Sequence, residues 1–225
     1  MSQTRLLVLA SSSPRRKELL ALGGWLFNIS PAEIDETPFS EEEPRHYVLR
    51  MAERKARIVA ARQSIDCMVV AADTIVVDSL DKNEQILGKP ADAAEAAEML
   101  FRLRGHQHDV YTAVAVMLVP ESLLLIDLCK TEVPMRNYTD QEIRAYINTG
   151  DPLDKAGAYA IQHAVFNPVQ NMRGCYANVV GLPLCHLTRT LMKAGVQPEA
   201  DVSGSCQAAL HYDCPIFSQI LCGGC

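Results

Sequence analysis

The feature that most constrains this chain is a short apolar run, residues 6–10, that leads into three serines and then a proline. Five consecutive apolar residues are typical of a buried strand. Ser11 to Ser13 follow this run, and Pro14 is a favoured first residue of a helix. A buried strand that turns directly into a helix indicates a layered α/β domain, because each layer has to cover the apolar face of the other.

Further strands and helices are predicted along the chain from apolar spacing and turn signals. Strands are predicted over residues 25–29 and 67–72, as a hairpin over 76–88 that turns at 81–83, and as an antiparallel pair over 110–119 and 123–133. Helices are predicted from Pro44, over 91–103, from a Thr139–Glu142 capping box, and from 181–183 to about 194. Strands and helices do not alternate strictly, so the sequence predicts an α/β fold with a mixed sheet.

The charge balance excludes some partners. The chain has 225 residues and a formal net charge of −6, whereas proteins that bind duplex nucleic acid or anionic membranes need a basic face. The apolar stretch over 110–133 is interrupted by Pro120, Glu121 and Ser122, so no run is long enough to span a bilayer. No signal peptide is recognisable. We therefore expect a cytoplasmic protein that binds neither nucleic acid nor membrane.

The turn over residues 11–16, Ser-Ser-Ser-Pro-Arg-Arg, is a candidate anion site. Backbone N–H groups at a helix start, serine hydroxyls and two guanidiniums can all bind phosphate oxygens. The turn can also be read as an ordinary serine-capped helix with solvated arginines, and caps are much commoner than phosphate sites.

Two further residues combine chemistry with a constrained position. Asp73 follows the predicted strand over 67–72, where a carboxylate can bind a cation or accept a proton, although a lone aspartate there is more often a turn residue. Lys55 lies on the same helix face as Val48, Met51 and Ala52. Its ammonium is therefore predicted to point to the interior or a cleft, or to extend along the surface into solvent, with equal weight.

The remaining polar segments are weak alone: Asp35-Glu36 in an acidic loop, Gly88-Lys89-Pro90, and residues 154–162. Together with the turn, Lys55 and Asp73, they provide what cleavage of a phosphate anhydride requires. Carboxylates gather a hard cation, lysines and arginines neutralise the leaving phosphates, and one carboxylate activates water.

The order of these motifs along the chain, and the residues within them, resemble those of the Maf family of nucleotide pyrophosphatases. The resemblance runs from about Leu6 to Ala194 and is carried by residues 10–20, 53–56, 72–76, 88–90, 154–162 and 178–184. It implies a mixed, strongly twisted sheet with flanking helices, two lobes around a central cleft, and a homodimer. It also implies hydrolysis of a nucleoside triphosphate to the monophosphate and pyrophosphate with Mg²⁺ or Mn²⁺.

The resemblance also assigns roles to residues. Asp73 inherits the role of proton acceptor, and base selectivity falls to three positions: Arg15, Thr74 and Gln162. Phosphate contacts are expected from Ser11, Arg16, Lys55 and Lys89, and metal contacts from Asp35, Glu36 and Asp73. The residues of the 154–162 segment resemble those of the family branch that acts on dTTP and UTP.

Other functions remain open from the sequence. The sister branch of the family acts on 7-methyl-GTP, a broader enzyme would remove modified nucleotides, and a regulator of cell division would bind nucleotide without turnover. Two departures concern the pocket: Ala160 stands where the family often has glycine, and His163 follows Gln162.

Residues 1–196 are predicted to form the catalytic domain and residues 197–225 a cysteine-rich tail. Cys206, Cys214, Cys222 and Cys225 match the thiolate count of a zinc site, but not its usual paired spacing. The tail is therefore predicted to bind zinc, to serve a redox role or neither. It is expected to be disordered or packed through its apolar residues: Ile216, Phe217, Ile220 and Leu221.

Overall fold

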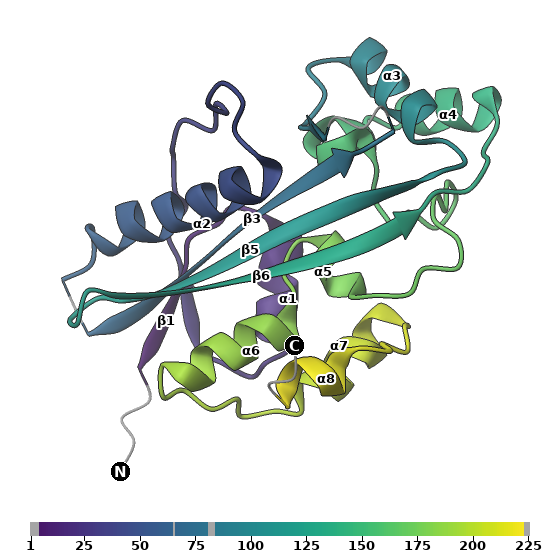
Figure 1. Cartoon of the computed structure of the whole chain (residues 1–225). Coiled ribbons are helices and arrows are strands. Elements are labelled where there is room, and N and C mark those ends of the chain that lie inside the picture. The colour runs from purple at the N-terminus through teal and green to yellow at the C-terminus, as the bar shows by residue number, and fades with distance from the viewer. Residues whose placement is uncertain (1–4, 65, 81–83, 223–225) are drawn as a thin grey trace.

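The computed structural model describes residues 5–64, 66–80 and 84–222. Within them, the strands form one six-stranded sheet in the order β2-β1-β3-β5-β6, with β4 paired to β3 (Figure 1). β1 (Leu6–Leu9) pairs in parallel with β2 (Phe27–Ile29) and β3 (Cys67–Asp78). β3 is antiparallel to β4 (Gln85–Leu87) and β5 (Gln107–Leu118), and β5 to β6 (Leu123–Pro134). The predicted mixed α/β sheet is confirmed.

Helices cover both faces of the sheet (Figure 1). α2 (Pro44–Ala60) packs on one face. The other face is covered by α1 (Pro14–Ala21), α5 (Tyr176–Val180) and α6 (Leu184–Lys193). α3 (Ala93–Leu103) and α4 (Asp140–Ile147) pack together at one end of the long strands. Successive β3 side chains enter opposite cores, so the first half of this strand reads as an unbroken apolar run.

The predicted strand over 67–72 was too short, and Asp73 is not a turn residue. β3 runs on to Asp78 because β5 pairs with it continuously along this length. Asp73 and Thr74 therefore lie in the middle of a strand, where their side chains point to opposite faces. The apolar residues after Thr74 were the signal for this continuation.

One edge of β3 has a break in its pairing. Among the described residues, β1 pairs with this edge as far as Val70, and β4 pairs with it from Val76 onward. Between them, the chain leaves β1 and turns into α1. Asp73 and Thr74 fall within this break. The turn that follows β1 therefore lies beside two residues whose side chains point to opposite faces of the strand.

The predicted hairpin is confirmed as the β3–β4 pair, but its turn at residues 81–83 lies outside the described residues. Several short helices were not predicted: α5, the 3-10 helices η1 (Asp151–Asp154) and η2 (Ala156–Ala158), and two tail helices, α7 (Val202–Leu210) and α8 (Phe217–Leu221). They are too short for hydrophobic periodicity to identify them.

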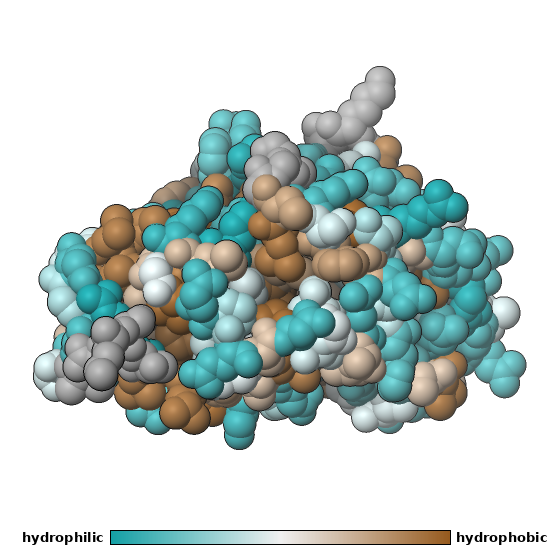
Figure 2. Space-filling view, turned by 90° about the horizontal axis from the view of Figure 1, so that it is seen from below, coloured by the Kyte–Doolittle hydropathy of each residue, from teal (hydrophilic) through white to brown (hydrophobic). Residues whose placement is uncertain are grey.

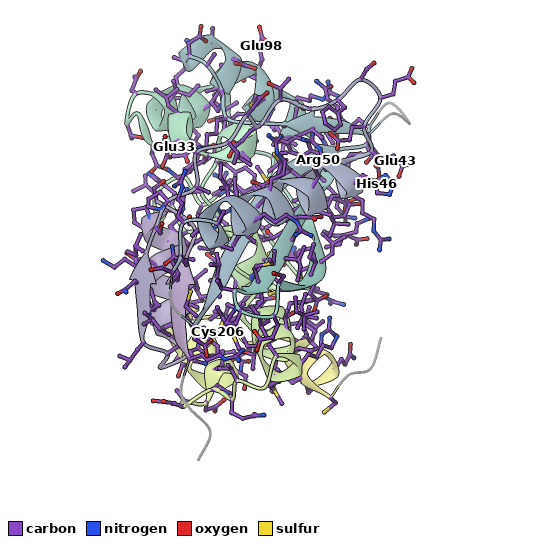
Figure 3. All side chains as sticks on the ribbon, turned by 90° about the vertical axis from the view of Figure 1, so that its left-hand side faces the viewer. Glu33, Glu43, His46, Arg50, Glu98 and Cys206 are labelled. Atoms are coloured by element: carbon purple, nitrogen blue, oxygen red, sulfur yellow. The ribbon has the colours of Figure 1, made fainter. Side chains whose placement is uncertain are left out.

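The tail packs against the body on the side of α6. Val202 and Ile220 are buried, and Tyr212 Oη accepts a hydrogen bond from the N–H of Gly174. Figure 2 views the molecule from this side and shows hydrophobic residues gathered toward its left and centre among polar ones. In Figure 3, the labelled Cys206 lies below the sheet, whereas Arg50 lies above it on α2.

Two cysteines of the tail meet two of the body. Cys206 and Cys214 line a cavity of ≈ 20 Å³ together with Cys175 and Cys185. Burial raises the pKa of Cys185 and of Cys206 to about 12, so these thiols pack as small apolar groups. In the described part of the chain, no three or more His, Cys, Asp or Glu side chains come together in a group that could hold a metal ion, and Cys225 lies outside that part. None of the described helices has both the length and the apolar character of a membrane span.

Candidate active site

A cavity of ≈ 440 Å³ opens at the break in β3 pairing. Its walls are the turn after β1, part of the acidic loop, Lys55 on α2, and two segments much later in the chain. These segments are residues 154–156 with 159–162, and residues 179–181. The volume falls within the range of small-molecule sites in proteins. The central cleft expected from the resemblance is therefore present.

Lys55 holds two carboxylates together at the floor of this cavity. Its Nζ lies 2.6 Å from Glu36 Oε1 and 2.6 Å from Asp73 Oδ1. Lys55 is 8% exposed and Asp73 is 6% exposed. The ammonium therefore points to the interior, which decides between the two orientations that the helix pattern left open. Asp73 lies directly beneath Lys55 and is not itself part of the cavity lining.

The acidic loop that carries Glu36 is held by α2. Tyr47 Oη donates to the carbonyl of Glu36 at 2.7 Å. Arg50 and Arg54 donate to the next carbonyl and to the preceding one, at 3.3 Å and 3.1 Å. In Figure 3 the labelled Glu33 and Glu43 lie on opposite sides of the view, so the loop between them crosses the molecule beside α2. Three side chains from one helix face thus fix the backbone that presents Glu36.

The pKa of Glu36 results from opposing effects. Burial acts to raise it, but the bond from Lys55 and the charges of Lys55, Lys89 and Arg16 outweigh burial and lower it. Glu36 is therefore ionised well below neutral pH and is available as a ligand for a cation.

The structure does not bring the Asp35 side chain into the cavity. The Asp35 carboxylate accepts the N–H of Thr37 at 2.9 Å and is exposed. Hydrogen bonding by the side chain of Thr37, and then by its backbone N–H, lowers the pKa of Asp35, and these contacts stabilise the loop. Adjacent residues in an extended loop point in opposite directions, so only one of the two carboxylates can face Lys55, and that one is Glu36.

Arg16 is anchored on the face of β3 opposite to Lys55. Its Nε donates to the carbonyl of Gly181 at 2.8 Å, and its Nη2 donates to Thr74 Oγ1 at 3.0 Å. Burial lowers the pKa of Arg16, while the charges of Asp73 and Glu36 act in the opposite direction. Gly181 has a φ of 122°, a backbone conformation that residues with a side chain rarely adopt.

The serine turn caps a helix and also faces the cavity. Ser13 caps α1 by accepting the N–H of Arg16 at 3.4 Å, and Ser11 Oγ accepts the N–H of Ser13 at 3.1 Å. All three serines line the cavity. The capping role is confirmed, and the binding of an anion by this turn stays a prediction.

The cavity is cationic although the protein is acidic. Five cationic side chains line it: Arg15, Arg16, Lys55, Lys89 and Lys155. Two carboxylates line it, Glu36 and Asp154. Arg15 lies 3.8 Å from Asp154, and Lys155 bonds Asp154 at 2.6 Å. This local excess of positive charge suits an anionic ligand such as a polyphosphate.

The predicted site residues therefore divide in three ways. Those that line the cavity are Ser11, Arg15, Arg16, Glu36, Lys55, Lys89, Thr74 and Gln162. Asp73 lies just beneath it, and Asp35 points elsewhere. Lys155 and Asn178 lie in the predicted motifs over 154–162 and 178–184 but were assigned no role of their own, and Thr112 was missed, because nothing in a single sequence shows that these residues meet.

This sheet and cationic cavity match those expected of a nucleotide-hydrolysing α/β protein, and comparison with known sequences gives the family. Residues 6–194 match the family of Maf-like proteins, so the chain belongs to that family.

Relatives cover most of the chain. A protein of Pelotomaculum thermopropionicum named dTTP/UTP pyrophosphatase is 46% identical over 84% of this chain and 96% of its own length. A Myxococcus xanthus protein of the same name is 47% identical over 85% and 93%. The Staphylococcus aureus Ham1 structure covers 59% of this chain and 73% of its own at 12% identity, with a TM-score of 0.40, a likeness too low to carry an argument.

Proposed function

We propose that this protein hydrolyses dTTP and UTP to the nucleoside monophosphate and pyrophosphate. The observation that carries the proposal is the Glu36–Lys55–Asp73 cluster in a cationic cavity large enough for a nucleotide. Relatives that share 38–47% of their residues with this chain bear the name of that activity. The fold places the cluster next to the serine turn, as binding of a triphosphate requires.

The donor set suits a divalent cation. Glu36 and Asp73 each lie 2.6 Å from the same nitrogen, so one cation already sits between their two charges. Mg²⁺ is usually bound through one or two carboxylates, with water and substrate phosphates completing its shell. Two carboxylates are enough for this mode, although they would not suffice for a closed protein site. Mg²⁺ or Mn²⁺ bound there would neutralise charge on the phosphates.

The remaining chemistry is assigned to the chain's own side chains. Lys89 and the serine hydroxyls grip the triphosphate, Lys55 absorbs charge on it, and Arg16, which is bonded to Gly181 and Thr74, adds positive charge beside it. Asp73 accepts a proton from the water that attacks the α-phosphorus, which expels pyrophosphate. Such a reaction depends on positioning and on charge stabilisation more than on covalent catalysis.

Gln162 and Thr74 are proposed to contact the base. Uracil and thymine present the same O2, N3–H and O4 and differ by one methyl group, which a pocket discriminates by only about 1–3 kcal/mol. One cavity can therefore accept both nucleotides. The homodimer and the cytoplasmic location stay predictions.

A nucleotide panel tests the proposal. Pyrophosphate release is measured for UTP, dTTP and 7-methyl-GTP with Mg²⁺ and with Mn²⁺. The proposal expects UTP and dTTP to be the preferred substrates. Preference for 7-methyl-GTP would overturn the assignment to the pyrimidine branch, and binding of all three without pyrophosphate release would favour a regulator.

A further inference from the structure

A buried chain of hydrogen bonds ends at the wall of the cavity. Thr112 Oγ1 donates to the backbone carbonyl of Asn178 at 3.0 Å, and it lies 3.0 Å from Thr74 Oγ1. Arg16 Nη2 donates to the same Thr74 oxygen. Thr112 and Asn178 are fully buried, whereas Thr74 lines the cavity.

Each threonine hydroxyl has a single hydrogen, and this decides which group donates and which accepts in these hydrogen bonds. A backbone carbonyl can only accept, so the hydrogen of Thr112 is used on Asn178. In the contact between the two threonines, Thr74 must therefore donate. The carbonyl of Gly181, 3.5 Å from Thr74 Oγ1, is a longer alternative that would consume the same hydrogen.

Thr74 is left with acceptor capacity alone. A hydroxyl has one hydrogen and two lone pairs. The hydrogen goes to Thr112, and one lone pair accepts from Arg16. A ligand in the cavity thus meets a hydroxyl oxygen that can accept one more hydrogen bond and has no hydrogen to give.

The position of Thr74 favours the nucleoside as its partner. Asp73 points to the α2 side, where Lys55 and Glu36 lie, and Thr74 points to the opposite side of the strand. A triphosphate held near Lys55 leaves the Thr74 side of the cavity to the rest of the nucleotide.

We propose that Thr112, acting through Thr74, selects bases that carry a hydrogen at N3. The inference rests on the proposed function, and it makes Thr112 a positioning residue that sets substrate choice. Uracil and thymine offer N3–H, which the Thr74 oxygen accepts. Cytosine presents a bare N3, so two acceptors would face each other and both would stay unpaired, which is the costly arrangement.

The test compares kcat/KM for UTP and CTP, which share ribose and triphosphate and differ in the base. The wild-type protein should prefer UTP by about tenfold or more. In Thr112→Val, the Thr74 hydroxyl loses its nearer acceptor, and only the longer contact with the Gly181 carbonyl at 3.5 Å still competes with cytosine for its hydrogen, so the preference for UTP should fall. Thr112→Ser keeps the hydroxyl and should keep the preference.

Thr188→Val is the matched control. Thr188 is a buried threonine of α6 whose hydroxyl has no partner among the described residues. The Thr188→Val variant replaces a buried threonine that takes no part in the hydrogen bonds of Thr74 and Thr112. The preference for UTP over CTP should therefore be unchanged in this variant. If Thr112→Val fails to fold, as judged by thermal unfolding, Thr112→Ala removes the same hydroxyl with a smaller side chain.

Three results would overturn the inference: an unchanged UTP-to-CTP ratio in Thr112→Val or Thr112→Ala, an equal loss for both nucleotides in these variants, or a wild-type protein that hydrolyses both equally. An equal loss would assign Thr74 to the shared ribose or phosphates. Absence of wild-type activity on UTP would instead refute the proposed function, so the two failures are distinguishable.

Discussion

The ammonium of Lys55 lies 2.6 Å from the carboxylate of Asp73, and both side chains are buried, Lys55 at the cavity floor and Asp73 beneath it. The pair joins the middle of α2 to the middle of β3. Since Glu36 contacts the same ammonium from the acidic loop, three distant segments of the chain meet at one nitrogen. The proposed hydrolysis depends on this meeting point.

Asp73→Asn should abolish turnover and preserve the fold. The amide has nearly the shape of the carboxylate but cannot accept a proton, so kcat should fall by about 10²–10⁴-fold. Steady-state kinetics and thermal unfolding are the measurements. Asp109→Asn, which removes an ion pair with Lys130 outside the cavity, is the control and should keep its activity. Near-normal rates in Asp73→Asn would refute the role given to this residue.

Lys55→Met should raise the pKa of Glu36. The hydrogen bond and the positive charge of Lys55 are major reasons why the pKa of Glu36 lies below its ordinary value. Methionine has a side chain of similar length but no charge. Carboxyl titration by carbon NMR would follow Glu36 in both proteins. Lys130→Met, which removes a lysine outside the cavity, should leave the titration unchanged. A Glu36 pKa that does not move would show that Lys55 does not control this carboxylate.

His108 should make the protein less stable in mild acid. Its ring is buried against the hydroxyl of Tyr159, and burial lowers its pKa to about 3. The unfolded chain takes up a proton near the ordinary histidine value of about 6.5, so stability is full above that pH and falls as the pH drops toward 3.

His108→Gln removes this titration and can still bond Tyr159. Between pH 7 and pH 5, the wild-type protein should lose about 2 kcal/mol more unfolding free energy than the variant does. Urea unfolding at the two pH values measures the difference. Equal losses in both proteins would mean that His108 has the same pKa in the folded and the unfolded protein.

Removing residues 197–225 should lower stability without changing kcat/KM for UTP. The tail buries Val202 and Ile220 against the body, but none of its described residues lines the large cavity. Thermal unfolding and steady-state kinetics on the shortened protein are the measurements. A folded variant with strongly reduced kcat/KM would assign the tail a part in the site.

The sequence predicted much of the fold and part of the site, for identifiable reasons. The helix stripe that contains Val48 and Met51 predicted that Lys55 lies on the buried face, but not that its partner is Asp73. That contact depends on the pairing of β3 with both β1 and β5, which places Asp73 under α2. Thr112 gave no signal, because a threonine within an apolar strand is ordinary.

The loop and the tail show where local patterns fail. Asp35 and Glu36 are adjacent acidic residues, and nothing in the sequence shows which of them faces the cavity. Hydrogen bonds from α2 side chains to the loop backbone fix the orientation in which Glu36 does so. The tail helices α7 and α8 gain stability from packing against α6, so their short sequences alone do not predict them.

The central claim is that water attacks the α-phosphorus of a nucleotide held at the Glu36–Lys55–Asp73 cluster. Hydrolysis of UTP in isotopically labelled water, followed by mass spectrometry of the products, tests it most directly. The account predicts one labelled oxygen in UMP and unlabelled pyrophosphate. Label in pyrophosphate, or formation of UDP and orthophosphate, would contradict it.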